Sequence, residues 1–368
     1  MPGRMAQWGN DLYTGKRSYD IVGTRNRWFI VAFLIVATSA ALLFGRGLNL
    51  GIAFRGGSEF TVPGVATTAQ EPAMEAVAAI EGAEPPRVSV LGTGDNRAIR
   101  VQTSQLSDTE TQSLKQGLAK AYDVPADDID AAFVGATWGA DVTSKATNGL
   151  VIFLILVSGV LTVYFRDWRM AVAGIVALLH DVVITVGVYA GIGWEVTPAT
   201  VIGFLTILGY SLYDTVVVFD KVRENVTGVL QQKRYTYDEL ANLALNQTLV
   251  RSLNTSVVAV LPVGSILFIG AFLLGAGTLR DISLALFVGI LVGTFSSVFI
   301  ATPLLSWLKD RSAAEREHKA VVMAARGAAA VDGETVEPGA VRVGSLIPGA
   351  HQGMAAQPRR KRPSGRAS

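Results

Sequence analysis

Six long apolar segments are the feature of this 368-residue chain that most limits what it can fold into. About 20 consecutive apolar residues cross the ~30 Å hydrocarbon core of a bilayer as a helix, whereas shorter apolar runs are typical of buried helices. Hydrophobic residues make up 50% of the chain and charged residues 17%, against roughly 25% charged residues in soluble domains. We therefore expect an α-helical polytopic membrane protein with six transmembrane helices, at residues 28–44, 148–165, 170–192, 199–219, 252–273 and 282–307.

Composition also excludes several classes of function. Cysteine is absent, which rules out disulfides, cysteine zinc sites, iron–sulfur clusters and a thiol nucleophile. Three histidines make a histidine-rich metal site improbable, and we expect no metal and no cofactor. A net charge of +2 gives no reason to expect binding of nucleic acid, which requires a clustered basic face.

The distribution of basic residues predicts the orientation in the membrane, because cytoplasmic loops are enriched in lysine and arginine. Between the fifth and sixth apolar segments only Arg280 is basic, and the loop between the third and fourth has none. The other side carries Lys16, Arg17, Arg25, Arg27, Arg166, Arg169, Lys221, Arg223, Lys233, Arg234, Arg251, Lys309 and Arg311. We expect both termini to be cytoplasmic, in a multi-pass protein of the cytoplasmic (plasma) membrane whose first 27 residues form a cytoplasmic segment.

Residues 46–145 are long enough for one extracytoplasmic domain between the first two spans. Changes in hydrophobic period predict strands at 59–62, 87–91, 99–103 and 129–136 and helices at 69–80 and 108–121. The order βαββαβ is that of a ferredoxin-like α+β domain. We find no catalytic constellation in it and expect a binding or moving part.

Residues 309–368 form a polar tail that ends in a basic run. Because it has few large apolar side chains, we expect it to be disordered in the cytoplasm, where its basic end could touch anionic lipid.

The most informative membrane residue is Asp214, about 9 Å from the cytoplasmic end of the fourth segment at about 1.5 Å rise per residue. A carboxylate at that depth costs about 2.5 kcal/mol or more to insert, so it normally faces a helix interface or a water-filled path. Helical spacing places Asp214 on one stripe with Gly203, Ile207 and Tyr210. We expect that stripe to face another helix.

Two further polar groups could belong to the same site. Arg251 opens the fifth segment, shares one side with Asn254 and Thr255, and can extend to the depth of Asp214, or it can snorkel to the headgroups. The adjacent pair His180 and Asp181 in the third segment suggests a polar network or a proton relay. In the sixth segment, Gly289, Gly293, Thr294, Ser296 and Ser297 favour close packing and interhelical hydrogen bonds.

These segments resemble the SecF family of bacterial protein-export membrane subunits, in the resistance-nodulation-division superfamily, over about residues 20–308. The motifs that carry the resemblance are Gly209-Tyr-Ser-Leu-Tyr-Asp214-Thr, Asp220-Lys-Val-Arg-Glu-Asn225, the run from Asn246 to Ser256, Leu179-His-Asp181 and Gly293-Thr-Phe-Ser-Ser297. The run Gly51-Ile-Ala53-Phe-Arg-Gly56-Gly57 resembles the family's glycine turn, but Ala53 replaces its acidic residue.

The resemblance implies a non-enzymatic subunit that works with SecD and the SecYEG channel, and indirectly with the SecA motor. It would use the proton-motive force to promote late export of preproteins. Asp214 and Arg251 would couple proton movement, since a proton crossing about 100 mV yields about 2.3 kcal/mol. The residues implied as a supporting polar network are Tyr210, Ser211, Thr215, Asn254, Thr255, His180 and Asp181, and Gly56 and Gly57 would form an extracytoplasmic turn. Six spans correspond to half of a transporter built from repeats, so a partner supplying the other half is expected.

Two alternatives belong to other functional classes. A half-transporter of the same superfamily that exports a lipid or small solute would share the polar spans. An intramembrane aspartyl protease would need paired acids, for which Asp181 and Asp214 are candidates, but its Gly-x-Gly-Asp signature is absent from the six predicted spans.

Overall fold

The computed structural model describes residues 4–331 apart from residues 81, 83, 93, 95, 96 and 274–276. These residues divide into two units. The central unit consists of Asn26–Val216 and Ser252–Ala301, and the terminal unit consists of the described parts of Met1–Arg25, Val217–Arg251 and Thr302–Ser368.

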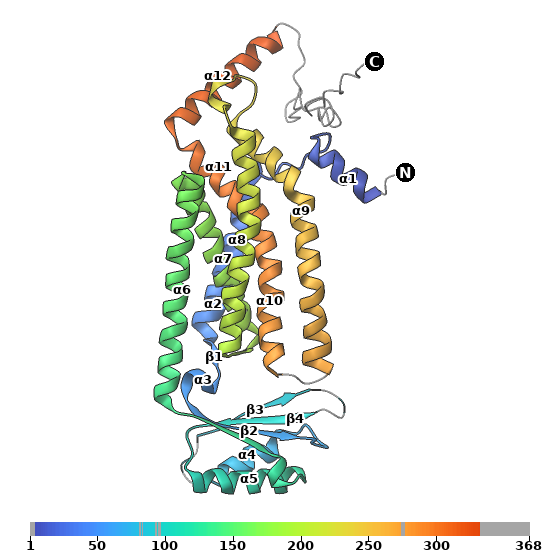
Figure 1. The fold of residues 1–368 in the computed structure, drawn as a ribbon, viewed down its shortest axis with the longest axis vertical. Helices are drawn as coiled ribbons and strands as arrows, with labels where there is room; N and C mark the ends of the chain where they lie inside the picture. Colours follow the sequence, from blue (N-terminus) through green and yellow to red (C-terminus); the bar gives the residue numbers. More distant parts are fainter. Residues whose placement is uncertain are drawn as a thin grey trace, which may run out of the picture. The chain divides into compact units, whose positions relative to one another are not determined.

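Six helical segments of the described chain are long and apolar enough to cross a membrane. These segments contain all the predicted spans except residues 271–273, which lie in the π-helix that continues the fifth segment. The prediction of a six-span helical membrane protein is therefore confirmed. The segments are α2 (Arg25–Arg46), α6 (Ala136–Phe165), α7 (Trp168–Ile192), α8 (Pro198–Val226), α9 (Tyr237–Ser265) with the π-helix η4 (Ile266–Leu273), and α10 (Gly277–Ser296) with the π-helix η5 (Ser297–Ala301) and α11 (Thr302–Asp310) (Figure 1).

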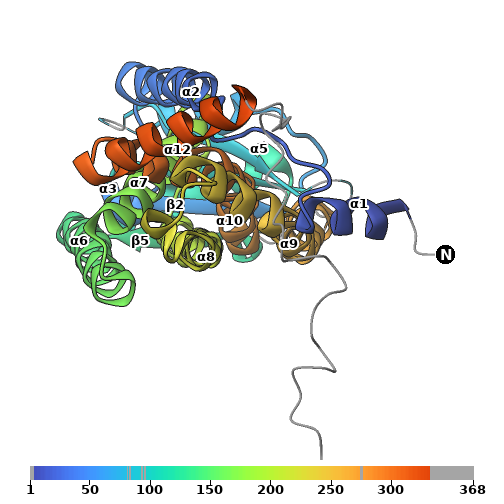
Figure 2. The same ribbon diagram turned by 90° about the horizontal axis from the view of Figure 1, so that it is seen from above.

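Helix α7 and the segment built on α10 are the most enclosed of the six apolar segments, each with 56% of its most apolar window buried. Helix α7 packs against α6 and α10 and lies among the other spans when viewed along their axes (Figure 2). The corresponding buried fraction is 17% in α6. The outer helices expose large apolar side chains such as Phe33 and Ile155, which suits contact with lipid or with another apolar surface.

Small residues bring α8 and α10 together, as the sequence predicted for Gly289 and Gly293. A Cβ atom built on Gly293 would lie 2.9 Å from the Cβ of Ser211, and one on Gly203 would lie 2.7 Å from the Cβ of Ala285. Real Cβ atoms essentially never approach so closely, so larger residues at these positions would force the two helices apart.

The segment between the first two spans folds as a four-stranded antiparallel sheet with two helices, in the predicted order βαββαβ. Its elements are β2 (Gly57–Pro63), α4 (Glu71–Ala78), β3 (Arg87–Leu91), β4 (Ala98–Thr103), α5 (Asp108–Tyr122), the short 3₁₀-helix η2 (Ala126–Asp128) and β5 (Asp130–Val134). The sheet order β3-β4-β2-β5 is the ferredoxin-like order, with the first and third strands of the domain at the centre.

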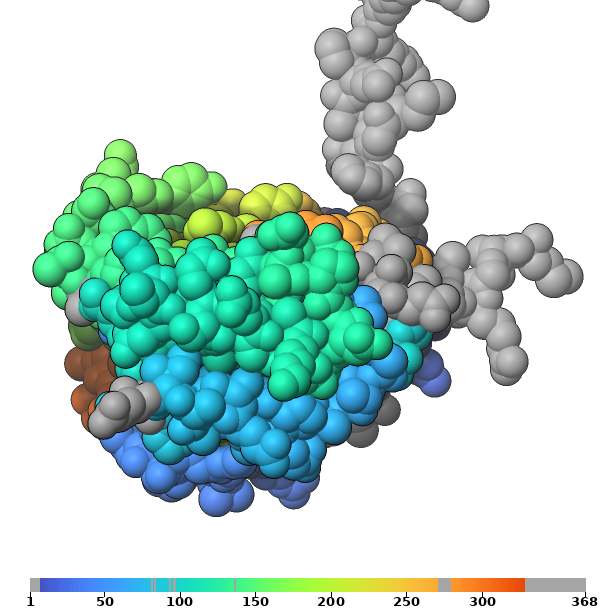
Figure 3. All heavy atoms as spheres, turned by 90° about the horizontal axis from the view of Figure 1, so that it is seen from below, coloured from blue at the N-terminus to red at the C-terminus, as the bar shows by residue number. Residues whose placement is uncertain are grey.

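One face of this sheet is covered by α4 and α5, which form the outer face of the domain (Figures 1 and 3). Alternation along β2 sends Phe60 and Val62 into a core with Leu114 and Leu118, while Glu59 lies on the opposite face. Helix α5 begins with a capping box between Ser107 and Glu110. The predicted domain boundary at residue 145 falls inside α6, which runs unbroken from Ala136 into the second span.

The uncovered face of the sheet carries polar side chains that bond to the loop between α7 and α8. Within that loop, the carboxylate of Glu195 accepts hydrogen bonds from Arg100 Nη1 at 3.1 Å and from Gln102 Nε2 at 2.7 Å, both on β4. The short strands β1 (Asn49–Leu50) and β6 (Glu195–Val196) pair in parallel beside it, and α3 (Ile52–Arg55) packs on α6. The α+β domain and the membrane helices of the central unit are therefore joined by a polar clamp centred on Glu195.

In the terminal unit, α9 organises the segment that precedes the first span. The side chain of Asn246 accepts a hydrogen bond from the Tyr19 backbone N–H at 2.7 Å, and Asn242 accepts one from Ile21 at 2.9 Å. Helix α1 (Arg4–Tyr13) precedes this segment, so the predicted N-terminal segment is partly helical. The short 3₁₀-helix η3 (Val229–Gln231) follows α8.

The structure corrects the prediction that residues 309–368 are disordered. Residues 313–331 form a helix, α12 (Ala313–Val331), while residues 332–368 lie outside the described residues. Lys319 Nζ bonds Asp238 at 2.6 Å, Arg326 makes two hydrogen bonds to Glu239 at 2.7 and 2.8 Å, and Val322 is fully buried. The hydrogen bond to Glu239 raises the pKa of Arg326 above its ordinary value.

We predict that truncation after Asp310 destabilises the terminal unit, whereas truncation after Val331 does not. The shorter chain loses the buried Val322 side chain, worth about 2 kcal/mol, and both carboxylate pairs of α12. Thermal unfolding of the purified protein in detergent measures the difference. Equal unfolding temperatures for the two truncated chains would contradict a structural role for α12.

We also predict that Glu195→Gln loosens the clamp, because a hydrogen bond to a charged group contributes about 1.5–3 kcal/mol. Amide hydrogen exchange at Leu50 and Val196 should become faster than in the wild type. Glu75→Gln is the matched control, since Glu75 is exposed on α4, away from the clamp. If the two variants exchange at the same rate, Glu195 does not hold the domain.

Candidate functional site

Asp214 lies in the middle of α8 and is almost completely enclosed, with 4% of its surface exposed. Its Oδ1 accepts a hydrogen bond from Ser252 Oγ of α9 at 2.8 Å, and its Oδ2 accepts one from Ser297 Oγ of η5 at 2.7 Å. The predicted stripe of Gly203, Ile207 and Asp214 is buried, as expected of a face that packs on other helices. Neutral hydroxyl donors on two neighbouring helices thus hold a carboxyl group inside the bundle.

Asp181 forms a second buried carboxyl site, on α7, with 1% of its surface exposed. Its Oδ2 accepts hydrogen bonds from Ser211 Oγ of α8 at 2.5 Å and from Ser296 Oγ of α10 at 2.8 Å. The Nδ1 of His180 lies 3.1 Å from Asp181 Oδ1, and the His180 ring stacks near Phe295. His180 and Asp181 therefore interact directly although they are neighbours on one helix.

The two carboxyl sites meet at Ser296 and Ser297, which are consecutive residues. Adjacent residues of a helix point about 100° apart, so Ser296 reaches α7 while Ser297 reaches α8. The helix changes here from the α-helix α10 to the π-helix η5, which begins at Ser297. Short π-helical segments within helices are frequent at functional sites.

The other polar residues predicted on α8 are also enclosed. Ser211 bonds Asp181 as described, and Thr215 is 1% exposed. Within the described residues, the buried hydroxyls of Tyr210 and Thr215 and the Nε2 of His180 show no hydrogen-bond partner. Unpaired buried polar atoms are costly, and they are places where water can bind.

On α9 the enclosed side differs from the side that the sequence singled out. Arg251 and Asn254 are exposed and Thr255 is half-buried, whereas Ser252 and Ser256 are buried. Ser252 bonds Asp214, and Ser256 Oγ lies 2.6 Å from Thr294 Oγ1. Ser252 was not singled out from the sequence, whereas Ser296 and Ser297 make interhelical hydrogen bonds of the kind expected for the sixth segment. The four-residue spacing of Ser252 and Ser256 was the available signal.

Gly56 and Gly57 connect α3 to β2, with backbone φ angles of 79° and 132°. Both angles lie in the region that favours glycine, because a side chain there meets steric strain. This turn directs the chain from the end of the first span into the central strand of the sheet.

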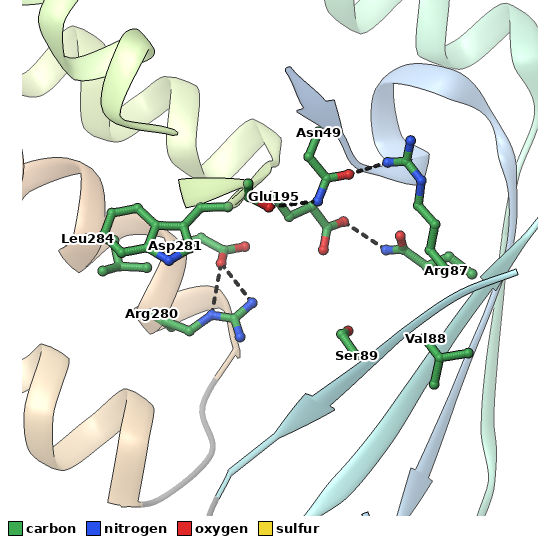
Figure 4. A pocket seen from close by; sticks show the side chains of 11 residues that line it. Asn49, Arg87, Val88, Ser89, Glu195, Arg280, Asp281 and Leu284 are labelled. Carbon is green, nitrogen blue, oxygen red and sulfur yellow. Dashed lines mark hydrogen bonds and ion pairs between the residues drawn. The ribbon is translucent and has the colours of Figure 1, made fainter. Parts of the chain in front are cut away.

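A pocket of about 470 Å³ lies between the sheet and the ends of the membrane helices (Figure 4). Charged side chains from both parts line it: Arg87 of β3, Glu195, and Arg280 with Asp281 of α10. Asp281 accepts a hydrogen bond from Thr197 Oγ1 at 3.0 Å. Burial lowers the pKa of the Arg87 guanidinium below its ordinary value, and the positive charge of Arg55 lowers it further.

In the described chain, no group of three or more histidine, aspartate or glutamate side chains could hold a metal ion.

Comparison with known families agrees with this architecture. Residues 114–311 match the family described as protein export membrane protein SecD/SecF, C-terminal. Residues 41–64, which include Gly56 and Gly57, match the SecD/SecF GG motif.

Individual relatives extend the match over most of the chain. The protein translocase subunit SecF of Streptomyces coelicolor is 46% identical over 339 residues, which cover 92% of this chain and 89% of that protein. The protein of the same name from Mycobacterium tuberculosis is 42% identical over 322 residues, covering 86% of this chain and 72% of its own length.

A solved structure shows the same fold. The crystal structure of SecDF from Thermus thermophilus, described as a translocon-associated membrane protein, superposes with a TM-score of 0.71 at 31% identity. The match covers 81% of this chain and 39% of the SecDF chain, so this chain spans about two fifths of that protein. The shared sequence, the matched motifs and the common fold show that this chain belongs to the SecD/SecF family of protein-export membrane proteins.

Proposed function

We propose that this chain is a SecF-type subunit of the bacterial Sec protein translocase that uses the proton-motive force to promote late-stage export of preproteins. Relatives 42–46% identical over most of the chain are named protein translocase subunit SecF. Since a structural neighbour carries this fold as about two fifths of a single SecDF chain, SecD is the partner that would complete the assembly. The SecYEG channel, and indirectly SecA, would supply the preprotein.

The observation that carries the proton-coupled role is the burial of Asp214 within a membrane helix. Placing a carboxylate there costs about 2.5 kcal/mol or more, and its serine donors are neutral groups that can bond either the charged or the protonated form. A proton that crosses about 100 mV releases about 2.3 kcal/mol. A carboxyl group in this position can use that energy if it takes the proton from one side and releases it to the other.

Arg251 is proposed as the second coupling residue. It precedes Ser252, whose hydroxyl bonds Asp214, so a rotation of α9 that moved Arg251 would also move this hydrogen bond. A guanidinium near the carboxyl group would favour its charged form and promote release of the proton. Tyr210, Ser211, Thr215, Thr255, His180 and Asp181 would form the surrounding polar network. Asn254, which is exposed on α9, would contribute only if that helix rotates.

The proposed orientation follows the basic residues. The terminal unit contains Arg25, Lys221, Arg223, Lys309 and Arg311, and positively charged loops stay in the cytoplasm. Both termini would be cytoplasmic, and the α+β domain would face outward across the plasma membrane. There it would meet the exported chain, and the Glu195 clamp would transmit movement of α7 and α8 to it.

We predict that Asp214→Asn reduces gradient-driven export to the level measured without a gradient while leaving assembly and ATP-driven steps intact. Asparagine keeps the size and some of the hydrogen bonding of the side chain but cannot exchange a proton. Export into inverted membrane vesicles, with and without an imposed proton gradient, measures the effect. Asp220→Asn is the matched control because Asp220 is exposed on the same helix. A wild-type gradient response in Asp214→Asn would return the residue to a packing role.

We further predict that Arg251→Lys keeps part of the gradient response and Arg251→Ala loses it, because lysine retains the charge but not the planar guanidinium. The same vesicle assay, at matched membrane levels, separates the two variants. Arg234→Ala, which removes an exposed arginine of the terminal unit, controls for general loss of positive charge. Equal activity of Arg251→Ala and the wild type would exclude Arg251 from coupling.

A further inference from the structure

Ser296 and Ser297 each lie within hydrogen-bond distance of a carboxylate and of the Gly293 carbonyl oxygen, and Ser297 Oγ also lies 3.3 Å from the carbonyl oxygen of Thr294. Ser297 Oγ lies 2.7 Å from Asp214 Oδ2 and 2.8 Å from the carbonyl oxygen of Gly293. Ser296 Oγ lies 2.8 Å from Asp181 Oδ2 and 3.2 Å from the same Gly293 oxygen. A hydroxyl group has one hydrogen, so a serine that donates to its carboxylate cannot at the same time donate to the Gly293 carbonyl.

The protonation state of the carboxyl group decides between that group and the Gly293 carbonyl as acceptor. A charged carboxylate is the stronger acceptor and takes the serine hydrogen. A protonated carboxyl group becomes a donor itself, and its hydrogen can go to the serine oxygen. The serine hydroxyl then turns to the Gly293 carbonyl, so proton binding at Asp214 reaches an oxygen atom that Ser296 also uses.

The positions of both carboxyl groups are fixed from a second side, which makes the serines rather than the carboxyl groups the moving parts. Ser252 holds Asp214 and Ser211 holds Asp181. Gly293 permits this arrangement, because a Cβ on it would lie 3.1 Å from Ser211 Oγ and 2.9 Å from Ser211 Cβ. The shared acceptor and the close approach of α8 therefore depend on the same residue.

We propose that Ser296 and Ser297 are positioning residues that couple the protonation of Asp181 to that of Asp214 through the Gly293 carbonyl. This inference deepens the proposed proton-coupled function and rests on it for its biological meaning. Once Ser297 donates to Gly293, that oxygen is a poorer acceptor for Ser296, which stays on the Asp181 carboxylate and keeps it charged. Asp181 and Asp214 then hold one proton between them rather than two. Repulsion between two charged carboxylates also favours this singly protonated state over the state in which both are charged.

Other titratable groups lie close to Asp181 and Asp214 and can affect their protonation. His180 lies against Asp181, and the Tyr210 hydroxyl is buried one helical turn before Asp214. Arg251 is the residue before Ser252 on α9. A coupling between the carboxyl groups should persist when His180 is replaced by glutamine, because the serine link does not pass through the imidazole ring.

Infrared difference spectroscopy of the full chain with its SecD partner in lipid nanodiscs tests the coupling. The carboxyl band lost in Asp214→Asn identifies Asp214, and its intensity against pH gives its proton affinity. Asp181→Asn should weaken proton binding at Asp214 about tenfold, the size at which two sites titrate as a unit. When Ser296→Ala and Ser297→Ala are also present, Asp181→Asn should weaken proton binding at Asp214 by less. When threonine replaces both serines instead, the full effect of Asp181→Asn should be restored, because threonine retains the hydroxyl group.

Ser283→Ala is the control, since Ser283 is a buried serine of α10 that bonds the backbone of its own helix. If the intensity of the Asp214 carboxyl band depends on pH in Asp181→Asn as it does in the wild type, the coupling is overturned. An equal Asp181→Asn effect with and without the serine hydroxyls would overturn their role. Because proton binding is measured without export, failure here is distinguishable from failure of the proposed function, which would appear as a wild-type gradient response in Asp214→Asn.

Discussion

Two buried carboxyl groups held by serine hydroxyls are the interaction on which the membrane part of this structure depends. Asp181 and Asp214 come from different helices, yet their donors Ser296 and Ser297 are consecutive residues of a third. Helices α7, α8 and α10 must therefore keep a common register, since sliding one of them would leave a carboxyl group unpaired in a medium where that is costly. Glycine at positions 203, 289 and 293 gives the close approach that this register requires.

The same helices end at the α+β domain, which links the buried site to the region that would meet an exported chain. The loop between α7 and α8 carries Glu195, and this residue binds the sheet through Arg100 and Gln102. A change in the relative positions of α7 and α8, the helices that carry the two carboxyl groups, would reach the sheet through this clamp. In the proposed mechanism, this arrangement would link proton binding to domain movement through the clamp.

Much of this architecture could be predicted from the sequence because the strongest signals are local. Apolar windows locate the spans, and the alternation around Phe60 and Val62 locates a strand with one covered face. The rotation of each helix about its axis is not a local property, which is why Ser252 was missed although Asp214 was found. Helix α12 was missed because it has few large apolar side chains, and its order comes from Val322 and from pairing with Asp238 and Glu239, distant in sequence.

The account predicts that Asp214 is the residue through which protons cross, and proton flux tests this most directly. The chain and SecD would be reconstituted with SecYEG, SecA and a preprotein in liposomes containing a pH-sensitive dye, with a proton gradient imposed across the membrane. Preprotein-dependent acidification of the lumen is expected with the wild type and with Asp220→Asn, and none beyond the leak of empty liposomes with Asp214→Asn. Equal flux through the wild type and Asp214→Asn would contradict the account, because a proton path independent of this carboxyl group would then exist.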